Sequence, residues 1–461
     1  MSSQAPVPAE EFRLIVLRQD ATEILLTGES FSYGLPVIHV PRHTRVAQSV
    51  TEAARRRWGI EIYCLFTLPR PASNSLLRYQ VAEICAPGSA SPAGTNWIAL
   101  GPFSTDSFVD PQDFLEIENA LNQLRQNKKD PGLGFFARQG WLAEIAGWIE
   151  NESSSVGSPL TGQFRQLNAS PTFSLVRFET TGQAIWFKAV GEPNLREFPI
   201  TLKLAELFPG YVCQILATKP DVNGWLSLEV QGVSLDECAG AESWNTAANC
   251  LADLQIASFG KTRGFLEAGA WDARPSTLLS LVKPFFEAIS VFMSRQAKTV
   301  PPPLSRDQLS TLKSQIEDAL CALMARSLPN TLGHVDANPG NIMISGQQAV
   351  FLDWAEACVG HPFFTFHFLQ EYLRRHTHDN DAQRNFVDSY LRPWEFRFAR
   401  TELEEILKPA SLCAVLAFAV SNDLWRSHDT EQSTDAYFRS LARRMKREAE
   451  LLQTRESICL S

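Results

Sequence analysis

One break in an otherwise helical stretch constrains the fold of this chain most. From about residue 243 to the end the pattern is mostly helical, but residues 330–365 interrupt it. There, two short apolar runs ending at Ile344 and starting at Ala349 flank a glycine-containing four-residue turn, which predicts a β-hairpin. If residue 344 pairs with 349, then 341 pairs with 352. Asn341 and Asp353 then fall together at the open end of the hairpin.

The polar residues around this hairpin suit phosphoryl transfer. Asn341 and Asp353 offer two oxygen ligands for Mg²⁺, and His334 and Asp336 lie in the loop just before the hairpin. A metal held by an Asn and an Asp neutralises phosphate charge, while a separate Asp orients or deprotonates the acceptor hydroxyl. Each residue alone fits a turn or a helix cap equally well. The four together, at this spacing, favour a catalytic site.

These residues also resemble a known family. His334-x-Asp336-x-x-x-x-Asn341, followed by Asp353-Trp354, looks like the catalytic loop and metal motif of the aminoglycoside phosphotransferase and choline kinase-like group. The resemblance covers about residues 160–461 and implies a bilobal protein-kinase-like fold that transfers the γ-phosphoryl group of ATP to small molecules. It implies Asp336 as the catalytic base, Asn341 and Asp353 as Mg²⁺ ligands, and His334 as a residue that braces the loop.

The segment before the helical part supplies candidates for the nucleotide. A kinase-like site needs a strand lysine for the phosphates and a helix glutamate to hold it. Lys188 ends the predicted strand 184–188, and Glu197 lies in the predicted helix 195–207. The strand 225–230 leads towards the hinge between the lobes, and backbone groups near Glu229 and Val230 would face the adenine.

The turn expected to cover the phosphates departs from the kinase pattern. It lies between Phe164 and Phe173 and contains no glycine, although glycine lets backbone N–H groups approach phosphates closely. Side chains of Asn168 and Ser170, and of Thr172, would donate hydrogen bonds instead. The missing glycines leave open a second interpretation, in which the fold only binds a nucleotide or a regulatory partner.

The N-terminal part is predicted to form a separate α+β domain over residues 1–150. Residues 46–58 have a helical composition and end at Gly59, and residues 151–160 have the composition of a linker. The kinase-like domain then covers residues 161–461, with an N-lobe at 161–232 and a C-lobe at 233–461.

The segment 33–60 of this first domain resembles a degenerate Nudix box. The positions of the four metal-binding glutamates hold Thr44, Ala53, Arg56 and Arg57, so this Nudix-like domain is expected to be catalytically inactive. A docking, regulatory or substrate-presenting role is the hypothesis for it.

The net charge and the distribution of apolar residues argue against a nucleic-acid binder, a secreted protein and a membrane protein. The chain has 42 Lys and Arg against 51 Asp and Glu, a net charge of −9, which lacks the basic character of a nucleic-acid binder. The N-terminus lacks the pattern of a signal peptide, and the longest apolar run in the C-terminal half is too short for a bilayer. The overall prediction is an α+β, cytoplasmic, ATP- and Mg²⁺-dependent phosphotransferase. Its partner would be a small-molecule hydroxyl acceptor, with no nucleic acid and no membrane.

Overall fold

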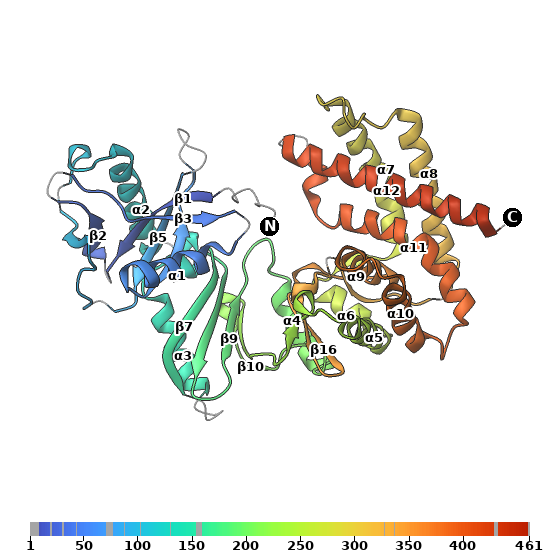
Figure 1. Ribbon diagram of the computed structural model, residues 1–461, viewed down its shortest axis with the longest axis horizontal. Coiled ribbons are helices and arrows are strands. Elements are labelled where there is room, and N and C mark those ends of the chain that lie inside the picture. Colours follow the sequence, from blue (N-terminus) through green and yellow to red (C-terminus); the bar gives the residue numbers. More distant parts are fainter. Residues whose placement is uncertain are drawn as a thin grey trace. The chain divides into compact units, whose positions relative to one another are not determined.

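The computed structural model describes most of the chain and divides into two compact units. It describes residues 9–18, 21–29, 32–42, 44–70, 77–86, 88–101, 103–129, 131–153, 159–326, 328–335, 337–427 and 432–459. The first unit comprises Met1–Phe198 and Ile215–Glu229, and the second comprises Pro199–Gln214 and Val230–Ser461 (Figure 1).

The first unit begins with a six-stranded mixed sheet of order β4-β5-β1-β2-β6, with β3 paired to β1. The strands are β1 (Ala9–Leu17), β2 (Glu23–Thr27), β3 (Val37–Pro41), β4 (Ile62–Thr67), β5 (Leu77–Ile84) and β6 (Thr95–Ala99). β1 runs parallel to β5 and antiparallel to β2 and β3.

Successive residues of β1 point alternately into two buried cores, and helices cover both faces of this sheet. Leu14 and Val16 belong to the same buried core as Val50 of α1 (Val46–Trp58), whereas Ile15 and Leu17 belong to the core on the other face. Successive side chains of a strand point to opposite faces, so a strand that is apolar at every position is buried on both sides. The second face is covered by α2 (Pro111–Lys129) and α3 (Trp141–Ser153).

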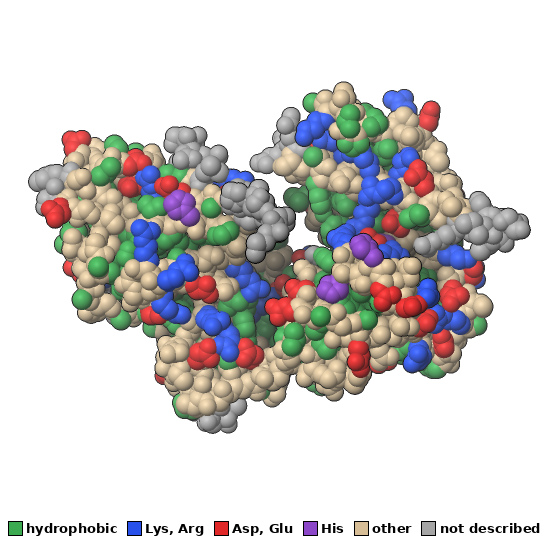
Figure 2. All heavy atoms as spheres, viewed as in Figure 1, with side chains coloured by type: hydrophobic (Ala, Val, Ile, Leu, Met, Phe, Trp, Pro, Cys, Tyr) green, Lys and Arg blue, Asp and Glu red, His purple; other side chains and the backbone are tan. Residues whose placement is uncertain are grey.

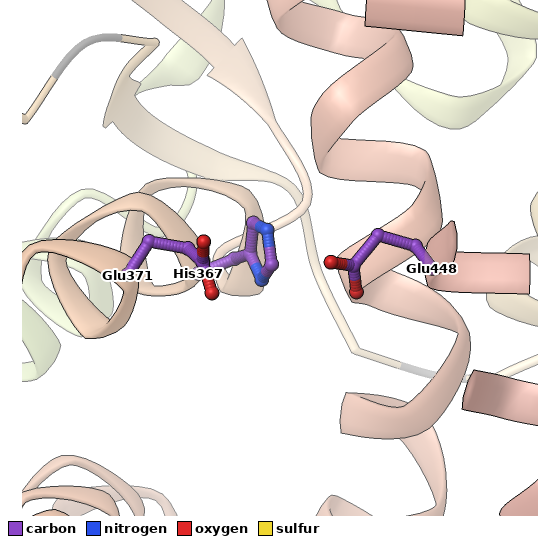
Figure 3. Close-up of side chains that lie close together, drawn as sticks. All are labelled: His367, Glu371 and Glu448. Atoms are coloured by element: carbon purple, nitrogen blue, oxygen red, sulfur yellow. The ribbon is translucent and has the colours of Figure 1, made fainter. Parts of the chain in front are cut away.

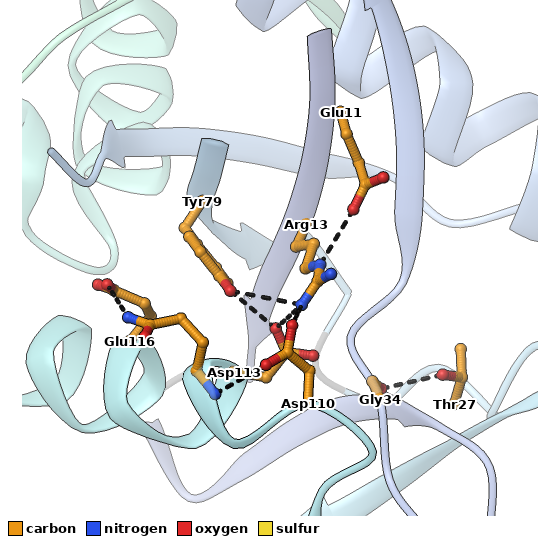
Figure 4. A network of polar contacts seen from close by, with 9 residues as sticks. Glu11, Arg13, Thr27, Gly34, Tyr79, Asp110, Asp113 and Glu116 are labelled. Atoms are coloured by element: carbon orange, nitrogen blue, oxygen red, sulfur yellow. Dashed lines mark hydrogen bonds and ion pairs between the residues drawn. The ribbon is translucent and has the colours of Figure 1, made fainter. Parts of the chain in front are cut away.

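A buried ionic network also ties β1 to α2. The Arg13 guanidinium donates to Asp113 Oδ1 at 2.6 Å and contacts Asp110, and the Tyr79 hydroxyl donates to the same oxygen of Asp113 at 2.9 Å (Figure 4). Asp113 is only 3% exposed. A buried carboxylate is tolerated where it is paired and hydrogen-bonded, and this one is both.

A second, five-stranded antiparallel sheet completes the first unit. Its order is β10-β11-β9-β8-β7, and its strands are β7 (Leu160–Ala169), β8 (Ser174–Thr180), β9 (Ile185–Ala189), β10 (Ile215–Lys219) and β11 (Gly224–Leu228). Phe187 of β9 packs against Phe136 and Trp148, so the two sheets share one hydrophobic core. The predicted linker 151–160 overlaps the end of α3 and the start of β7, and residues 154–158 of it lie outside the described residues. The division at residue 150 stays a prediction.

The second unit is mostly helical, as expected. Its helices include α5 (Ala241–Ala257), α6 (Thr262–Glu267), α7 (Pro275–Ser294), α8 (Arg306–Met324), α9 (Phe363–His376), α10 (Asn380–Leu391), α11 (Arg400–Val420) and α12 (Gln432–Cys459). α4 (Glu197–Leu207) starts at the end of the first unit and continues in the second. α8 begins with a capping box, in which Ser305 and Gln308 satisfy each other's backbone N–H groups.

Two three-stranded sheets interrupt these helices where the sequence breaks its helical pattern. One has the order β12 (Val233–Ser234), β15 (Ile342–Ser345), β16 (Gln348–Phe351), and the other β13 (Trp271–Ala273), β17 (Ala357–Gly360), β14 (Thr331–His334). The predicted α+β content, β-rich at 161–232 and mostly helical afterwards, is confirmed.

Two further observations bear on the excluded classes. α7 is long and apolar enough to cross a membrane by length and composition. Its buried residues, however, include Leu278, Phe285 and Phe292 of the main core, as in a core helix.

On the face seen in Figure 2, acidic and basic side chains are interspersed over most of both units. The absence of nucleic-acid and membrane partners stays a prediction.

Candidate functional site

The predicted hairpin forms with the expected register. Ile344 pairs with Ala349, and Ile342 with Phe351. The Leu352 N–H donates to the Asn341 carbonyl at 2.8 Å, so residue 341 lies opposite 352 as the sequence predicted. The next residue is Asp353, and the open end of the hairpin therefore carries Asn341 and Asp353 at adjacent positions.

Asp353 adopts a backbone conformation that requires support. Its φ of 60° and ψ of 65° are left-handed, which is uncommon for a residue with a side chain. His334 supplies one support, because its Nε2 lies 2.6 Å from the Asp353 carbonyl oxygen. The Asp353 side chain itself is exposed. In this conformation the backbone turns sharply after the hairpin, and the Asp353 carboxylate lies at the surface.

His334 is itself fixed within the second unit. It ends β14, where its N–H donates to Thr365 Oγ1 of α9 at 2.9 Å, and its ring lies 5.6 Å from the Trp354 ring. The imidazole is buried. These contacts match the bracing role that the family resemblance implies for His334. Asp336, the expected catalytic base, lies outside the described residues.

The donor set at the hairpin fits a magnesium ion. An amide oxygen and an exposed carboxylate on adjacent positions are hard oxygen ligands, and Mg²⁺ is commonly bound through one or two such groups together with waters and substrate phosphates. Asn341 is half-buried at the end of a short 3₁₀ turn, Pro339–Asn341, which Asn338 caps. Asn341 and Asp353 are the residues that would hold the ion.

In the first unit, Lys188 and Glu197 form a close ion pair. Lys188 Nζ lies 2.5 Å from Glu197 Oε1, and the two side chains are 14% and 2% exposed. Lys188 belongs to β9, flanked by β8 and β11, and its ammonium lies 5.8 Å from the Trp225 ring. The structure thus brings together the strand lysine and helix glutamate that the sequence predicted as a pair. The pairing is observed, and its role in binding phosphates stays a prediction.

The predicted phosphate-covering segment forms the β7–β8 hairpin. Asn168 lies in β7 opposite Leu175 and is half-buried. Ser170 starts the turn: its N–H donates to the Phe173 carbonyl at 2.9 Å, and its hydroxyl accepts from the Phe173 N–H at 3.0 Å. The Ser170 hydroxyl keeps its own proton for donation, whereas Thr172 is the exposed residue of the turn.

The predicted hinge residues lie at a crossing between the two units. The chain passes from the first unit to the second between Glu229 and Val230. However, the Glu229 N–H donates to the Ala184 carbonyl at 2.9 Å, and its carbonyl accepts from the Gln183 side chain. The Arg177 guanidinium holds the Glu229 side chain and lowers its pKa. Adenine contact through the Glu229 backbone would require these bonds to open, and it stays a prediction.

One polar cluster was not found from the sequence. His367 and Glu371, one turn apart on α9, face Glu448 of α12, with ligand atoms within 4.8 Å of one another (Figure 3). Arg374 donates to Glu371 at 2.8 Å, and Arg444 lies 3.6 Å from its second oxygen. Burial lowers the pKa of His367 to about 3, so the imidazole is neutral. With guanidinium groups already on Glu371, we interpret the cluster as an ion-pair group. Only the His-x-x-x-Glu spacing was visible in the sequence.

One family model and several solved structures are similar to this chain. Residues 194–406 match the model of the family described as "Phosphotransferase enzyme family". The match includes Glu197, His334, Asn341 and Asp353, and it confirms the predicted phosphotransferase relationship and enzyme class.

Solved structures give distant similarities. A choline kinase from Cryptosporidium parvum is 12% identical with a TM-score of 0.45, covering 68% of this chain and 96% of its own. An ethanolamine kinase from Plasmodium vivax is 14% identical with a TM-score of 0.45, covering 75% and 95%. A macrolide 2′-phosphotransferase from Brachybacterium faecium is 12% identical with a TM-score of 0.42, covering 65% and 98%. No curated protein matches the chain significantly. The Nudix-like resemblance of the first domain stays a prediction.

Proposed function

We propose that this protein transfers the γ-phosphoryl group of ATP to a hydroxyl of a small molecule, in a Mg²⁺-dependent reaction. The observation that carries the proposal is the hairpin end, where Asn341 and Asp353 occupy adjacent positions and His334 supports Asp353, inside a segment that matches the model of a phosphotransferase family. A cytoplasmic location is part of the same proposal.

The residues of this chain have separable tasks in that reaction. Lys188, held by Glu197, binds the α- and β-phosphates, and Asn341 and Asp353 hold Mg²⁺, which neutralises phosphate charge. Asp336 accepts the proton of the acceptor hydroxyl. The acceptor oxygen forms a bond to the γ-phosphorus as the bond from that phosphorus to the β,γ-bridging oxygen breaks, and ADP leaves.

The first experiment measures the thermal unfolding midpoint with and without ATP and Mg²⁺. A ligand that binds the folded state raises the midpoint by mass action, by about 2.7 kcal/mol of stabilisation at 100 times its Kd. Wild type should show a Mg²⁺-dependent rise, and Asp353→Asn should lose it. No rise for wild type at millimolar nucleotide would contradict ATP use.

A second experiment separates an enzyme from a protein that only binds nucleotide. With a panel of amino alcohols and hydroxylated antibiotics as acceptors, Asp336→Ala should abolish ADP release that depends on the acceptor and should keep the ATP-induced midpoint shift. ATP binding without turnover on any acceptor would instead favour the binding-only interpretation, to which the glycine-free turn points.

A further inference from the structure

The β7–β8 turn, residues 170–173, lies next to the strand that carries Lys188. Leu175 of β8 pairs with Lys188, and Ser174 pairs with Ala189. Directly after β9, Gly191 contacts the turn so closely that an added Cβ would lie 2.3 Å from the Thr172 Cβ. The turn therefore stands beside the lysine end of the sheet, where the proposed function requires a cover for the nucleotide phosphates.

The N-terminal part of the chain holds this turn from a second side. The Phe136 N–H, in a short 3₁₀ turn (Phe135–Ala137), donates to the Pro171 carbonyl at 3.0 Å. Gly134 has a φ of 111°, and a Cβ added there would lie 2.3 Å from the same carbonyl oxygen. Only glycine allows this approach, since it combines a positive φ with a contact that leaves no room for a side chain.

The loop that makes this contact is itself fixed. The buried side chain of Asn127, near the end of α2, donates to the Gly134 carbonyl at 3.1 Å and accepts from the Leu133 N–H at 3.1 Å. The two bonds satisfy backbone groups on both sides of the loop and connect it to the core of the first domain.

A separate contact joins β7 to the N-terminal sheet. The Gln166 side chain accepts from the Cys64 N–H at 2.7 Å and donates to the Cys64 carbonyl at 3.0 Å, and it is only 1% exposed. Cys64 lies in β4, the edge strand of the first sheet, and both strands are irregular at this point. Irregularities of this kind redirect side chains. Figure 1 also shows α1 beside β7.

We propose that residues 9–153 are a positioning element for nucleotide binding: through Phe136, Gly134 and the Cys64 backbone, which binds Gln166 of β7, they fix the glycine-free turn in the conformation that covers the phosphates of ATP. This inference rests on the proposed function. The glycines that allow close approach lie in the segments that contact the turn, at Gly134 and Gly191, and the turn itself contains none. A turn fixed before the nucleotide arrives does not lose conformational freedom on binding.

The test uses the full chain and two matched substitutions. Gly134→Ala places a Cβ against the Pro171 carbonyl, whereas Gly140→Ala puts an alanine at another positive φ, 79°, with nothing within 4 Å. Both substitutions strain the backbone, and only the first pushes on the turn. If Gly134→Ala does not fold, Asn127→Ala provides the same test. It removes the two hydrogen bonds that hold the loop and places no side chain against the Pro171 carbonyl.

The readout is the Kd of ATP with Mg²⁺ and, separately, the Kd of adenosine, both by calorimetry. If the substitution leaves the turn correctly placed in about a tenth of the molecules, the ATP Kd rises about tenfold. The adenosine Kd should stay within twofold of wild type, since adenosine carries no phosphates for the turn to cover. Hydrogen exchange at the Phe136 and Phe173 amides should accelerate in Gly134→Ala and not in Gly140→Ala.

The outcomes distinguish this inference from the proposed function. Equal ATP affinities of Gly134→Ala and Gly140→Ala, or parallel losses for ATP and adenosine, would overturn the positioning role while leaving the phosphotransferase proposal standing. A wild-type protein that does not bind ATP would overturn both.

Discussion

Replacing Lys188 with methionine should destabilise the first unit by about 3 kcal/mol. Glu197 is 2% exposed, and its oxygen lies 2.5 Å from the Lys188 ammonium. Removing one partner of a buried ion pair costs roughly 3–5 kcal/mol, because the remaining charge loses its compensation. Glu197 has a further interaction, so the lower end of that range applies.

The size of the effect makes it measurable by scanning calorimetry in the absence of nucleotide. For a unit of about 200 residues, ~3 kcal/mol corresponds to a fall of roughly 6–12 °C in the unfolding midpoint. The double variant Lys188→Met/Glu197→Leu should recover most of this loss, which gives a coupling of about 2 kcal/mol or more between the two positions. The coupling measures the pair itself, apart from any role in catalysis.

A pair at the end of β10 whose carboxylate is exposed to solvent provides the control. Lys219 and Asp221 lie 2.8 Å apart, with side chains 17% and 60% exposed, and pairs of this kind contribute about 0.2–1 kcal/mol. Lys219→Met should therefore shift the midpoint by no more than about 4 °C. A loss below about 1 kcal/mol for Lys188→Met, similar to the control, would refute the argument from burial.

Three further outcomes follow from buried charges and imidazoles. Arg13→Met should cost about 3–5 kcal/mol in urea unfolding, because it leaves the buried Asp113 without a guanidinium. Burial lowers the pKa of His361 and His367 to about 3, against about 6.5 when unfolded. The unfolded chain thus binds more protons below pH 6.5, and each histidine should remove about 2 kcal/mol of stability between pH 7.5 and 5. His367→Leu should roughly halve that loss. Zinc should leave the unfolding midpoint unchanged, since arginines already hold Glu371 beside His367, and a zinc-dependent rise that His367→Leu abolishes would contradict our interpretation of the cluster.

Local patterns predicted the parts of the site that lie close together in sequence. The hairpin register follows from the two-residue period of a strand and the length of its turn, and these two features are enough to place Asn341 opposite 352. The helix 46–58 and its end at Gly59, with a φ of 65°, followed equally from composition and a glycine cap. Lys188 and Glu197 are nine residues apart, and they were paired because a kinase-like site needs a strand lysine and a glutamate on the following helix.

Long-range hydrogen bonds left no such pattern. Gln166 reaches a backbone group 102 residues away, and the hydrogen bond between Phe136 and Pro171 depends on two loops whose sequences give no period. The sharing of one core by the two sheets of the first unit was missed for the same reason. The pattern of a single strand does not state which second layer covers its outer face.

The positions aligned with the Nudix glutamates make other contacts in the first domain. Thr44 donates to the Pro41 carbonyl, Arg57 donates to the Val37 carbonyl, and Ala53 packs against the core beneath α1, against which Ala169 of β7 also packs. A glutamate at residue 53 would place a charge in that partly buried contact, at a cost that only a bound cation would offset. An alanine at residue 53 keeps this face of α1 apolar where α1 packs near β7, the strand that leads into the β7–β8 turn.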